Sequence, residues 1–577
     1  MKNKNLQVLG LAALAAVGFT ACDGLGKMVK NAKTVQYSAT PNPVVLVGDS
    51  IGVTIAGKFP ANYFGKNVVV TATPVVKYAG GEKTMKPITI QGETAPGTGT
   101  KIAYAGGGSF SYTGKVGYEK GIEKATVELK IVGAIKTKTK EFPAVKVADG
   151  TIVTQLLAQN DEKPIFAKDA FVKSRPISAS SVIYYLINQS NVRPDELTSK
   201  EMKEFEDFIT NGLAKGFDFK NASISAYASP DGEASKNANL ANERAESAAK
   251  ALISMFKDKK HKFEAGEKAE FYNKVGKGED WEGFKTLMEQ SSIKDKELIL
   301  RVLSMYDNRD QREKEIKNLS KTFDEVAEKV LPKLRRSMIT LNGEEKSRSD
   351  EEISKLMTSA PDNLSVEELL YAAANLTKDL NTRLNLYKTA EKNFPNDWRG
   401  INNAGVIYLM QNKVTEADAE FTKAAQVDAA NKAVKNNQGI VARWKGDRKK
   451  ASELFKAAAG AGPEVSYNLG VIDLMSGNYS AAISNFGSFN TFNHALAKLL
   501  NGNADAANAT LDASQEFDTA YGNYLKAIIA ARGGKADGVM NNLKTAIGKD
   551  ASLKAKAKDD AEFIKMFDNA DFKALTN

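Results

Sequence analysis

The chain has 577 residues, of which 42% are hydrophobic and 26% are charged, and its formal net charge is +10. This length allows several domains, and the composition is that of a globular protein. The basic residues are spread along the chain without a nucleic-acid-binding motif, which argues against nucleic acid as a partner. A single cysteine excludes a disulfide within the chain and a zinc site built from cysteines.

The N-terminus carries the features of an export signal. Lys2 and Lys4 precede an apolar run from Leu6 to Phe19, which is shorter than the roughly 20 residues of a membrane-spanning helix. The run ends at Phe19-Thr20-Ala21-Cys22, with small residues before the cysteine. This ending resembles the lipobox of bacterial lipoproteins, although Phe19 stands where leucine is usual.

The lipobox resemblance implies a signal peptide over residues 1–21, cleavage before Cys22, acylation of Cys22 and a tether over residues 22–33. The alternative is an ordinary secretory signal in which the cysteine occurs by chance. Surface-exported lipoproteins of the Bacteroidota carry several acidic residues after this cysteine, whereas here only Asp23 follows. We therefore expect a lipid anchor in the outer membrane, with the body of the protein facing the periplasm.

Residues 34–155 are predicted to form an all-β sandwich of antiparallel strands. Short β-branched segments such as Asn67–Thr73 and Ala125–Ile131 are separated by glycine-rich turns such as Gly106–Gly108. Several segments alternate apolar and polar residues, as half-buried strands do. The region has neither an Asp-rich calcium loop nor a histidine cluster, so we interpret it as a spacer or docking module.

Residues 177–345 mix strand and helix patterns and predict one central α/β domain. The expected strands and helices are Val182–Leu186, Asp195–Leu213, Ala222–Tyr227, Asn237–Met255 and Leu334–Leu341. After the second strand the chain has Ser229 and Gly232, and the following helix contains Asn237, Leu240 and Arg244. This spacing resembles the OmpA-like domain shared with the peptidoglycan-associated lipoprotein. The resemblance also implies that residues 261–329 are a helical insertion that short members of the family lack.

The OmpA-like resemblance implies contact with peptidoglycan. Arg244 takes the place of the arginine with which the family grips the diaminopimelate of the stem peptide, and such a fork binds a carboxylate bidentately. Ser229 stands at the family's aspartate position, and Asp231 is the candidate substitute for the missing charge. A second interpretation is that Arg244 braces this loop through Asp231 or Glu233.

Residues 361–550 are predicted to form an all-α array of repeats, followed by a helical cap over residues 551–577. Gly405 and Gly439 lie 34 residues apart, and Phe421 and Phe455 keep the same offset from them. The period and these residue types resemble tetratricopeptide repeats, which stack into a solenoid with a concave binding face. This resemblance implies a protein partner. Candidate contact residues on the first helices, whose amides suit a peptide backbone, are Asn402, Asn403, Asn436, Asn437, Tyr467 and Asn468.

The sequence predicts no catalytic residues, no metal site and no cofactor. Its two histidines, His261 and His494, fall in different domains, and nucleotide-binding and hydrolase motifs are missing. The chain is therefore expected to be a lipid-anchored envelope scaffold that contacts peptidoglycan and binds protein partners through its repeats. The alternative is an accessory subunit of an outer-membrane assembly or secretion complex without peptidoglycan binding. Lipoproteins that combine the two resembled modules are familiar in the Bacteroidota.

Overall fold

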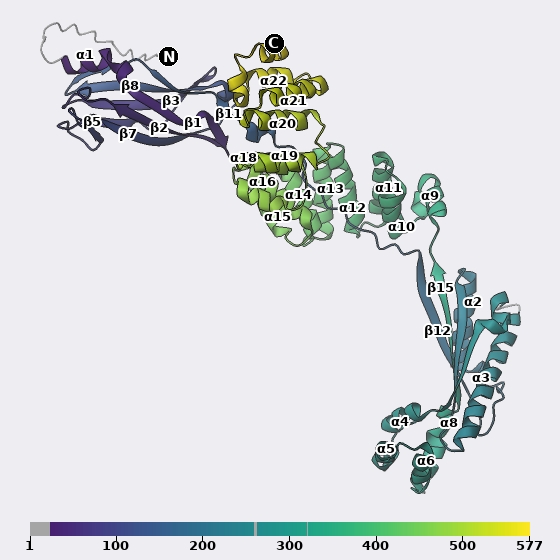
Figure 1. Cartoon of the computed structure of the whole chain (residues 1–577). Coiled ribbons are helices and arrows are strands. Elements are labelled where there is room, and N and C mark those ends of the chain that lie inside the picture. Colours follow the sequence, from purple (N-terminus) through teal and green to yellow (C-terminus); the bar gives the residue numbers. More distant parts are fainter. Residues whose placement is uncertain (1–22, 259–261, 320) are drawn as a thin grey trace, which may run out of the picture. The chain divides into compact units, whose positions relative to one another are not determined.

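The computed structural model describes residues 23–258, 262–319 and 321–577 (Figure 1). These residues divide into two compact units. The first contains the chain up to Ala167 and again from Arg383 to Asn577, and the second is Lys168–Thr382. The predicted signal peptide, Cys22 and His261 lie outside the described residues.

The first unit begins with a β-sandwich over the predicted residues. One sheet has the strand order β11-β1-β2-β7, and the other has the order β10-β8-β3-β5-β6, with β4 on β3 and β9 on β8. Most pairs are antiparallel, but β1 with β11 and β5 with β6 are parallel. The strands are β1 Gln36–Val47, β2 Ser50–Phe59, β3 Val69–Tyr78, β4 Gly81–Thr84, β5 Ile88–Gly92, β6 Thr100–Ile102, β7 Gly108–Gly117, β8 Thr126–Ile135, β9 Lys138–Glu141, β10 Val145–Asp149 and β11 Thr151–Ile152.

The core of the sandwich lies between the two sheets and extends to the preceding helix. Alternate residues of β2 are buried, as the period of two in its sequence predicts. Residues 22–33 were expected to be a tether, but α1 (Asp23–Lys30) forms there, and its Leu25 and Met28 are buried in the sandwich core. These two apolar side chains lie three residues apart, so one face of the helix buries both.

The remainder of the first unit is an array of antiparallel helix pairs (Figure 1). The pairs are α12 Trp398–Met410 with α13 Val414–Val427, α14 Lys432–Trp444 with α15 Arg448–Ala457, α16 Pro463–Met475 with α17 Tyr479–Phe486, α18 Phe492–Leu500 with α19 Ala504–Asp512, and α20 Ala520–Arg532 with α21 Ala536–Lys549. Helix α11 (Leu380–Asn393) precedes them. The predicted cap contains α22 Leu553–Asp559, η9 Ala561–Met566 and α23 Ala570–Thr576.

The repeated glycines exist because a phenylalanine packs against each of them. A Cβ atom added to Gly405 would lie 2.6 Å from the ring of Phe421, and one added to Gly439 would lie 2.6 Å from Phe455. Gly470 stands in the same relation to Phe486, at 2.8 Å. All three rings are fully buried, so the two helices of a pair approach closely only where the side chain is missing.

The second unit contains a four-stranded sheet with the order β12-β15-β13-β14. Its strands are β12 Ser174–Tyr184, β13 Asp218–Ala228, β14 Tyr272–Glu279 and β15 Arg336–Lys346, with β13 and β14 parallel and the other pairs antiparallel. Helices α2 (Lys200–Ala214) and α3 (Ala234–Lys257) bury their apolar stripes in the sheet's core. Each helix and strand expected in the central domain overlaps an observed one, but β12 begins at Ser174, well before the expected Val182, and β15 continues to Lys346.

The expected insertion differs at its first end. Residues 261–329 were assigned to it, but Tyr272–Glu279 form β14, which extends the sheet as a parallel neighbour of β13. The added helices lie beyond it and form a small core around Phe284 and Val326. They are α4 Trp281–Gln290, α5 Lys296–Met305, α6 Arg309–Lys317, α7 Lys321–Lys329 and α8 Leu331–Leu334.

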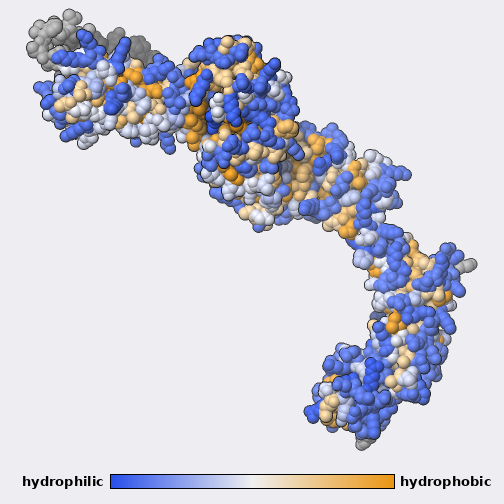
Figure 2. Space-filling model, in the orientation of Figure 1, coloured by the Kyte–Doolittle hydropathy of each residue, from blue (hydrophilic) through white to orange (hydrophobic). Residues whose placement is uncertain are grey.

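The second unit ends with helices that the sequence partly assigned to the repeat array. Residues from 361 were expected to start that array, but α10 (Val366–Tyr371) and η8 (Ala372–Leu376) belong to the second unit, as does α9 (Asp350–Ser359). On the face shown in Figure 2 most of the surface is hydrophilic, and hydrophobic patches occur over the helical repeats. None of the described helices is both long and apolar enough to cross a membrane.

Candidate functional site

Four successive first helices of the repeats carry asparagine side chains that are at most 1% exposed. An amide buried in a helix interior is costly unless its hydrogen bonds are made, so these residues need partners from another element. The helices are α12, α14, α16 and α18. The buried asparagines are Asn402, Asn403, Asn436, Asn437, Asn468 and Asn493.

The partner is residues 159–167 of the same chain, called the strap below, which follow the β-sandwich and lie in no helix or strand. Single asparagines each accept a hydrogen bond from the N–H of one strap residue and donate one to its C=O. The pairs are Asn493 with Gln159 (2.8 and 2.9 Å), Asn468 with Lys163 (2.7 and 3.0 Å), Asn437 with Ile165 (2.8 and 2.9 Å) and Asn403 with Ala167 (2.7 and 2.9 Å).

The spacing of these contacts follows from the geometry of an extended chain. Alternate residues of such a chain point their N–H and C=O groups to the same side, so Lys163, Ile165 and Ala167 meet successive repeats. The strap runs in the direction opposite to the order of the repeats. Pro164, which has no N–H, lies at an intervening position where the described repeats make no backbone contact with it.

The second asparagine of each pair completes the hydrogen bonding. Asn402 donates to the Ile165 carbonyl at 3.0 Å, and its own oxygen accepts from Asn437 at 2.9 Å. Asn436 donates to the Lys163 carbonyl at 3.1 Å and accepts from Asn468 at 2.9 Å. The amides therefore form a continuous ladder that links neighbouring repeats as well as the strap.

A buried ion pair anchors the acidic part of the strap. The Glu162 side chain is fully buried and pairs with Arg443, whose Nη2 lies 2.5 Å from Glu162 Oε2. The same oxygen accepts from Trp444 Nε1 at 2.8 Å, and Arg443 Nη1 donates to Asn160 at 2.7 Å. The strap thus supplies a carboxylate to a cation that would otherwise be buried alone.

The neighbouring carboxylate belongs to Asp161, which is half-buried. It accepts hydrogen bonds from Tyr467 and, at 2.5 Å, from Asn493. Burial raises the pKa of Asp161 to about 6, although the hydrogen bond from Tyr467 and the charge of Lys163 lower it in part. Burial and the Asp161 charge together raise the pKa of Tyr467. The acidic end of the strap therefore binds at an electrostatic cost that its ladder contacts offset.

All six predicted contact residues of the repeats thus contact the strap. Tyr467 does so through the Asp161 side chain, and the five asparagines do so through the strap backbone. Sequence reasoning missed Asn493 and Arg443. Asn493 follows Asn468 in a shortened repeat that lacks the signature glycine, so its equivalence was hidden. No sequence pattern singled out Arg443, because its partner, Glu162, is 281 residues away in the chain.

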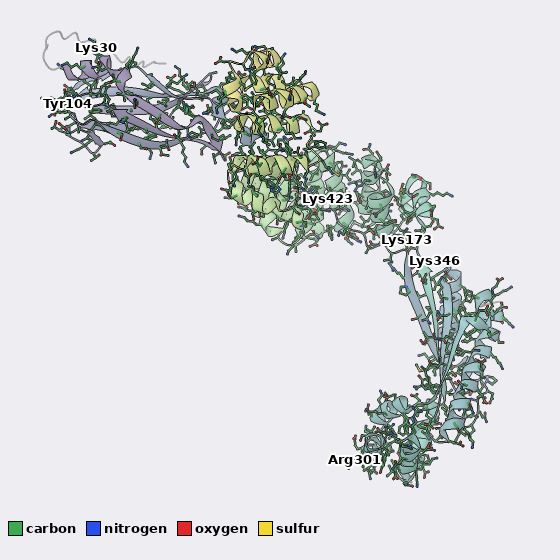
Figure 3. All side chains as sticks on the ribbon, in the orientation of Figure 1. Lys30, Tyr104, Lys173, Arg301, Lys346 and Lys423 are labelled. Atoms are coloured by element: carbon green, nitrogen blue, oxygen red, sulfur yellow. The ribbon has the colours of Figure 1, made fainter. Side chains whose placement is uncertain are left out.

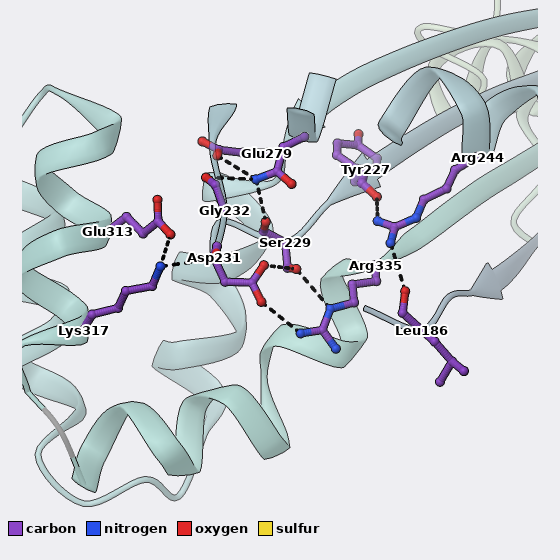
Figure 4. A network of polar contacts seen from close by, with 11 residues as sticks. Leu186, Tyr227, Ser229, Asp231, Gly232, Arg244, Glu279, Glu313, Lys317 and Arg335 are labelled. Carbon is purple, nitrogen blue, oxygen red and sulfur yellow. Dashed lines mark hydrogen bonds and ion pairs between the residues drawn. The ribbon is translucent and has the colours of Figure 1, made fainter. Parts of the chain in front are cut away.

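The loop after β13 holds the residues that the OmpA-like resemblance selected, and several of them point toward one another (Figure 4). Ser229 Oγ donates to Asp231 at 2.5 Å, and Arg335 donates to both, at 3.1 Å to each. Both members of the Arg335–Asp231 ion pair are nearly buried. Lys317 of the inserted helix α6 also donates to the Asp231 carbonyl, at 3.3 Å.

Arg244 lies apart from this pair and is 1% exposed. Its guanidinium donates to the carbonyls of Tyr227 and Leu186 at 2.8 and 3.2 Å (Figure 4). It also donates to the Gln189 carbonyl at 3.0 Å. Burial lowers its pKa to about 10. Arg244 therefore joins three chain segments, and Asp231 is held by Arg335 instead. The bracing of the loop by Arg244 through Asp231 or Glu233 has no direct hydrogen bond in the described residues.

Candidate chemistry elsewhere is limited in the part of the chain that the structure describes. No group of three or more histidine, cysteine or carboxylate residues there is placed to hold a metal ion. His494 is buried, its Nδ1 lies 2.8 Å from the Phe489 carbonyl, and burial lowers its pKa. It packs beside Phe486 in the core of the repeats.

Comparison with known proteins finds similarity to repeat proteins. No family model matches the sequence, and no curated protein matches it. A solved tetratricopeptide repeat protein from Parabacteroides merdae is 15% identical, with 40% of this chain and 91% of that chain covered and a TM-score of 0.28. PilF of Pseudomonas aeruginosa is 16% identical, with 39% and 98% covered and a TM-score of 0.26. The Cut9–Hcn1 structure is 11% identical, with 65% and 58% covered and a TM-score of 0.31. These scores are low, so the assignment of helical repeats rests on the glycine–phenylalanine packing described above.

Proposed function

We propose that this protein is a scaffold whose helical repeats hold extended polypeptide segments and bind protein partners. The observation that carries the proposal is the asparagine ladder, in which Asn403, Asn437 and Asn468 each bind both backbone groups of one strap residue. Such contacts recognise an extended backbone of almost any sequence, which is what a polypeptide-binding groove needs. The strap gives these repeats one such segment within the chain.

The proposal includes no enzymatic activity. Its support is that the buried ionisable groups of the groove are engaged in holding the strap. Glu162 pairs with Arg443, and Asp161 accepts from Tyr467 and Asn493. Each makes contacts that orient or neutralise it, which assigns these groups to binding the strap.

The finer parts of the proposal concern location. We propose that the chain is an outer-membrane lipoprotein of the Bacteroidota type, anchored at Cys22 and facing the periplasm. The support is the lipobox resemblance and the single acidic residue after it. Mass spectrometry of the mature N-terminus tests the anchor directly. An unmodified thiol at Cys22 would rule it out.

Peptidoglycan contact through Arg244, Ser229 and Asp231 is a separate hypothesis. The spacing of Ser229 and Arg244 favours it, but the site geometry favours the alternative of an accessory subunit without wall binding. A stem peptide would have to displace three carbonyl groups from Arg244 and separate Asp231 from Arg335. Lost contacts to a charged group cost about 1.5–3 kcal/mol each, so this exchange is unfavourable.

Pull-down of the full-length protein on purified peptidoglycan decides between these two functions. The variants are Arg244→Ala and, as a matched control, Arg301→Ala, which removes an exposed arginine from α5 of the same unit (Figure 3). Retention of the wild type and the control but not of Arg244→Ala would establish wall binding. We expect weak and equal retention of all three proteins.

Photo-crosslinking of the intact protein in its native envelope tests the scaffold function. A photoreactive residue replaces the half-buried Lys163 of the strap, and a matched control replaces the exposed Lys138 on β9. We expect Lys163 to give a product between the strap and the repeats and a further product with a separate polypeptide. If both positions crosslink only to lipid, the scaffold proposal fails.

A further inference from the structure

The contacts between the strap and its groove differ in how strongly they depend on the sequence of the strap. The asparagine contacts to N–H and C=O groups recognise only backbone, so a strap shifted by two residues would offer the same groups to the same amides. Two acidic side chains break this equivalence, because Asp161 accepts hydrogen bonds from Tyr467 and Asn493 and Glu162 makes a buried ion pair. Glu162 reaches Arg443 and Trp444, and only one register of the strap brings a carboxylate there. The stronger of the two selections is the Glu162 position, because Arg443 is a buried cation that needs a carboxylate there.

The aromatic end of the strap adds a further, weaker selection. Phe166 lies 6.5 Å from the Tyr387 ring, measured between ring centroids, and Arg383 lies 5.0 Å from the centroid of Phe166. Phe166 is only half-buried, so its contribution is smaller than that of the Glu162 ion pair. An acidic residue followed four positions later by an aromatic one is the pattern that this groove fits.

Release of the strap from the groove would disrupt no helix or strand. Residues 158–172 form no helix or strand, and from Lys168 to Lys173 the chain is half-buried or exposed. Release would therefore open backbone contacts in the groove while β11 and β12 keep their own pairings. The docked state also brings two adjacent carboxylates into the groove, the buried Glu162 and the half-buried Asp161, and a segment with one acid avoids part of this cost.

We propose that the strap is a resident ligand of the groove, and that an extended partner segment with an acidic residue in the Glu162 position displaces it. This inference rests on the scaffold function and names the chemistry of its partner. A partner must overcome the high effective concentration of a tethered segment, which is in the millimolar range for short flexible connections. The strap thereby keeps the groove closed to weakly bound polypeptides.

Fluorescence anisotropy with the full-length protein tests the displacement. The probe is a labelled peptide that copies residues 158–168. Glu162→Gln removes the carboxylate of the strap but keeps the shape of the side chain, so the groove holds the strap more weakly. The peptide still carries the acid that pairs with Arg443. We expect this variant to bind the peptide at least tenfold more tightly than the wild type does. The exposed acid Glu141 on β9 provides the control Glu141→Gln, which should match the wild type.

A second peptide, with glutamine in place of the acid at the Glu162 position, tests the specificity. It should bind the Glu162→Gln protein at least tenfold more weakly than the acidic peptide. Adding Arg443→Ala should remove the difference between the two peptides. Equal affinity of the two peptides for Glu162→Gln would overturn the acidic selection.

Hydrogen exchange in the same variants separates failure of this inference from failure of the scaffold function. If the amides of Lys163 and Ile165 exchange faster in Glu162→Gln but no peptide binds, the strap is a permanent clasp and the inference is wrong. If these amides exchange at the same rate in wild type and Asn437→Ala, the ladder does not hold the strap and the scaffold function itself fails. Circular dichroism verifies that each variant remains folded.

Discussion

Removing the amide of Asn437 is the most direct perturbation of the groove. Asn437→Ala deletes the hydrogen bonds accepted from the Ile165 N–H (2.8 Å) and from Asn436 (3.1 Å), and the two donated to the Ile165 carbonyl and to Asn402 (both 2.9 Å). The Ile165 carbonyl keeps its bond from Asn402, so two groups lose their protein partner: the Ile165 N–H and the Asn402 oxygen.

The expected magnitude follows from these two groups. An unsatisfied buried donor or acceptor costs about 1–3 kcal/mol. The Ile165 N–H is only partly buried, so we expect a total near the lower end, about 3 kcal/mol against the docked strap. At about 1.4 kcal/mol per factor of ten, local opening of the strap becomes about 100-fold more frequent.

Native-state hydrogen exchange measures this opening at the level of single amides, which suits a chain with several domains better than one global melting curve. The amides of Lys163 and Ile165 should lose protection in Asn437→Ala, while amides in the core strand β13 should not. The control is Asn541→Ala, which removes an exposed asparagine from α21 of the same array. A change below threefold at Ile165, or an equal change in the control, would refute the reasoning.

Three further changes test other parts of the structure. Asp161→Asn should stabilise the docked strap at pH 7. The pKa of Asp161 in the folded protein, about 6, lies above the ordinary value of 3.8, so the wild type loses up to about 3 kcal/mol as pH rises from 4 to 7 and the variant does not. Urea unfolding followed by tryptophan fluorescence should show the stabilities of the two proteins diverging over that pH range, and parallel curves would contradict this expectation. Gly439→Ala should lower the melting temperature, because the new Cβ would lie 2.6 Å from the Phe455 ring and overpacking costs about 1–3 kcal/mol. The control Gly548→Ala, on α21 with open space around the position, should leave the melting temperature unchanged or raise it. Arg335→Ala should destabilise the second unit by about 3 kcal/mol, since it leaves the nearly buried Asp231 without its cation, while Arg301→Ala should have little effect in the same denaturation experiment.

Much of the architecture follows from local sequence signals. The period of 34 residues and the pairs of glycine and phenylalanine predict the helix pairs, because close helix packing requires a missing side chain opposite a large one. The alternation in the β-sandwich and the helix pattern of the central domain depend equally on neighbours in sequence. Five of the six buried inner-face asparagines were likewise visible, because each lies near a signature glycine, whereas Asn493 does not.

The occupant of the groove could not be predicted in this way. The strap lies between the predicted domains 34–155 and 177–345, and it has neither a helical nor a strand period. Its bonds join residues 236 to 334 positions apart, and most of them are made by backbone groups that every residue has. A contact of this kind leaves almost no mark on the sequence.

The same distinction holds for the loop after β13. The sequence determined the spacing of Ser229 and Arg244, and with it the hypothesis of a charged clamp. Only the tertiary structure decided that Arg335 pairs with Asp231 and that three carbonyl groups surround Arg244. Residue types show which charges a chain carries, but the partner of each charge depends on which distant segments the fold brings to it, because a buried ion is stabilised by whatever polar groups lie within hydrogen-bonding distance.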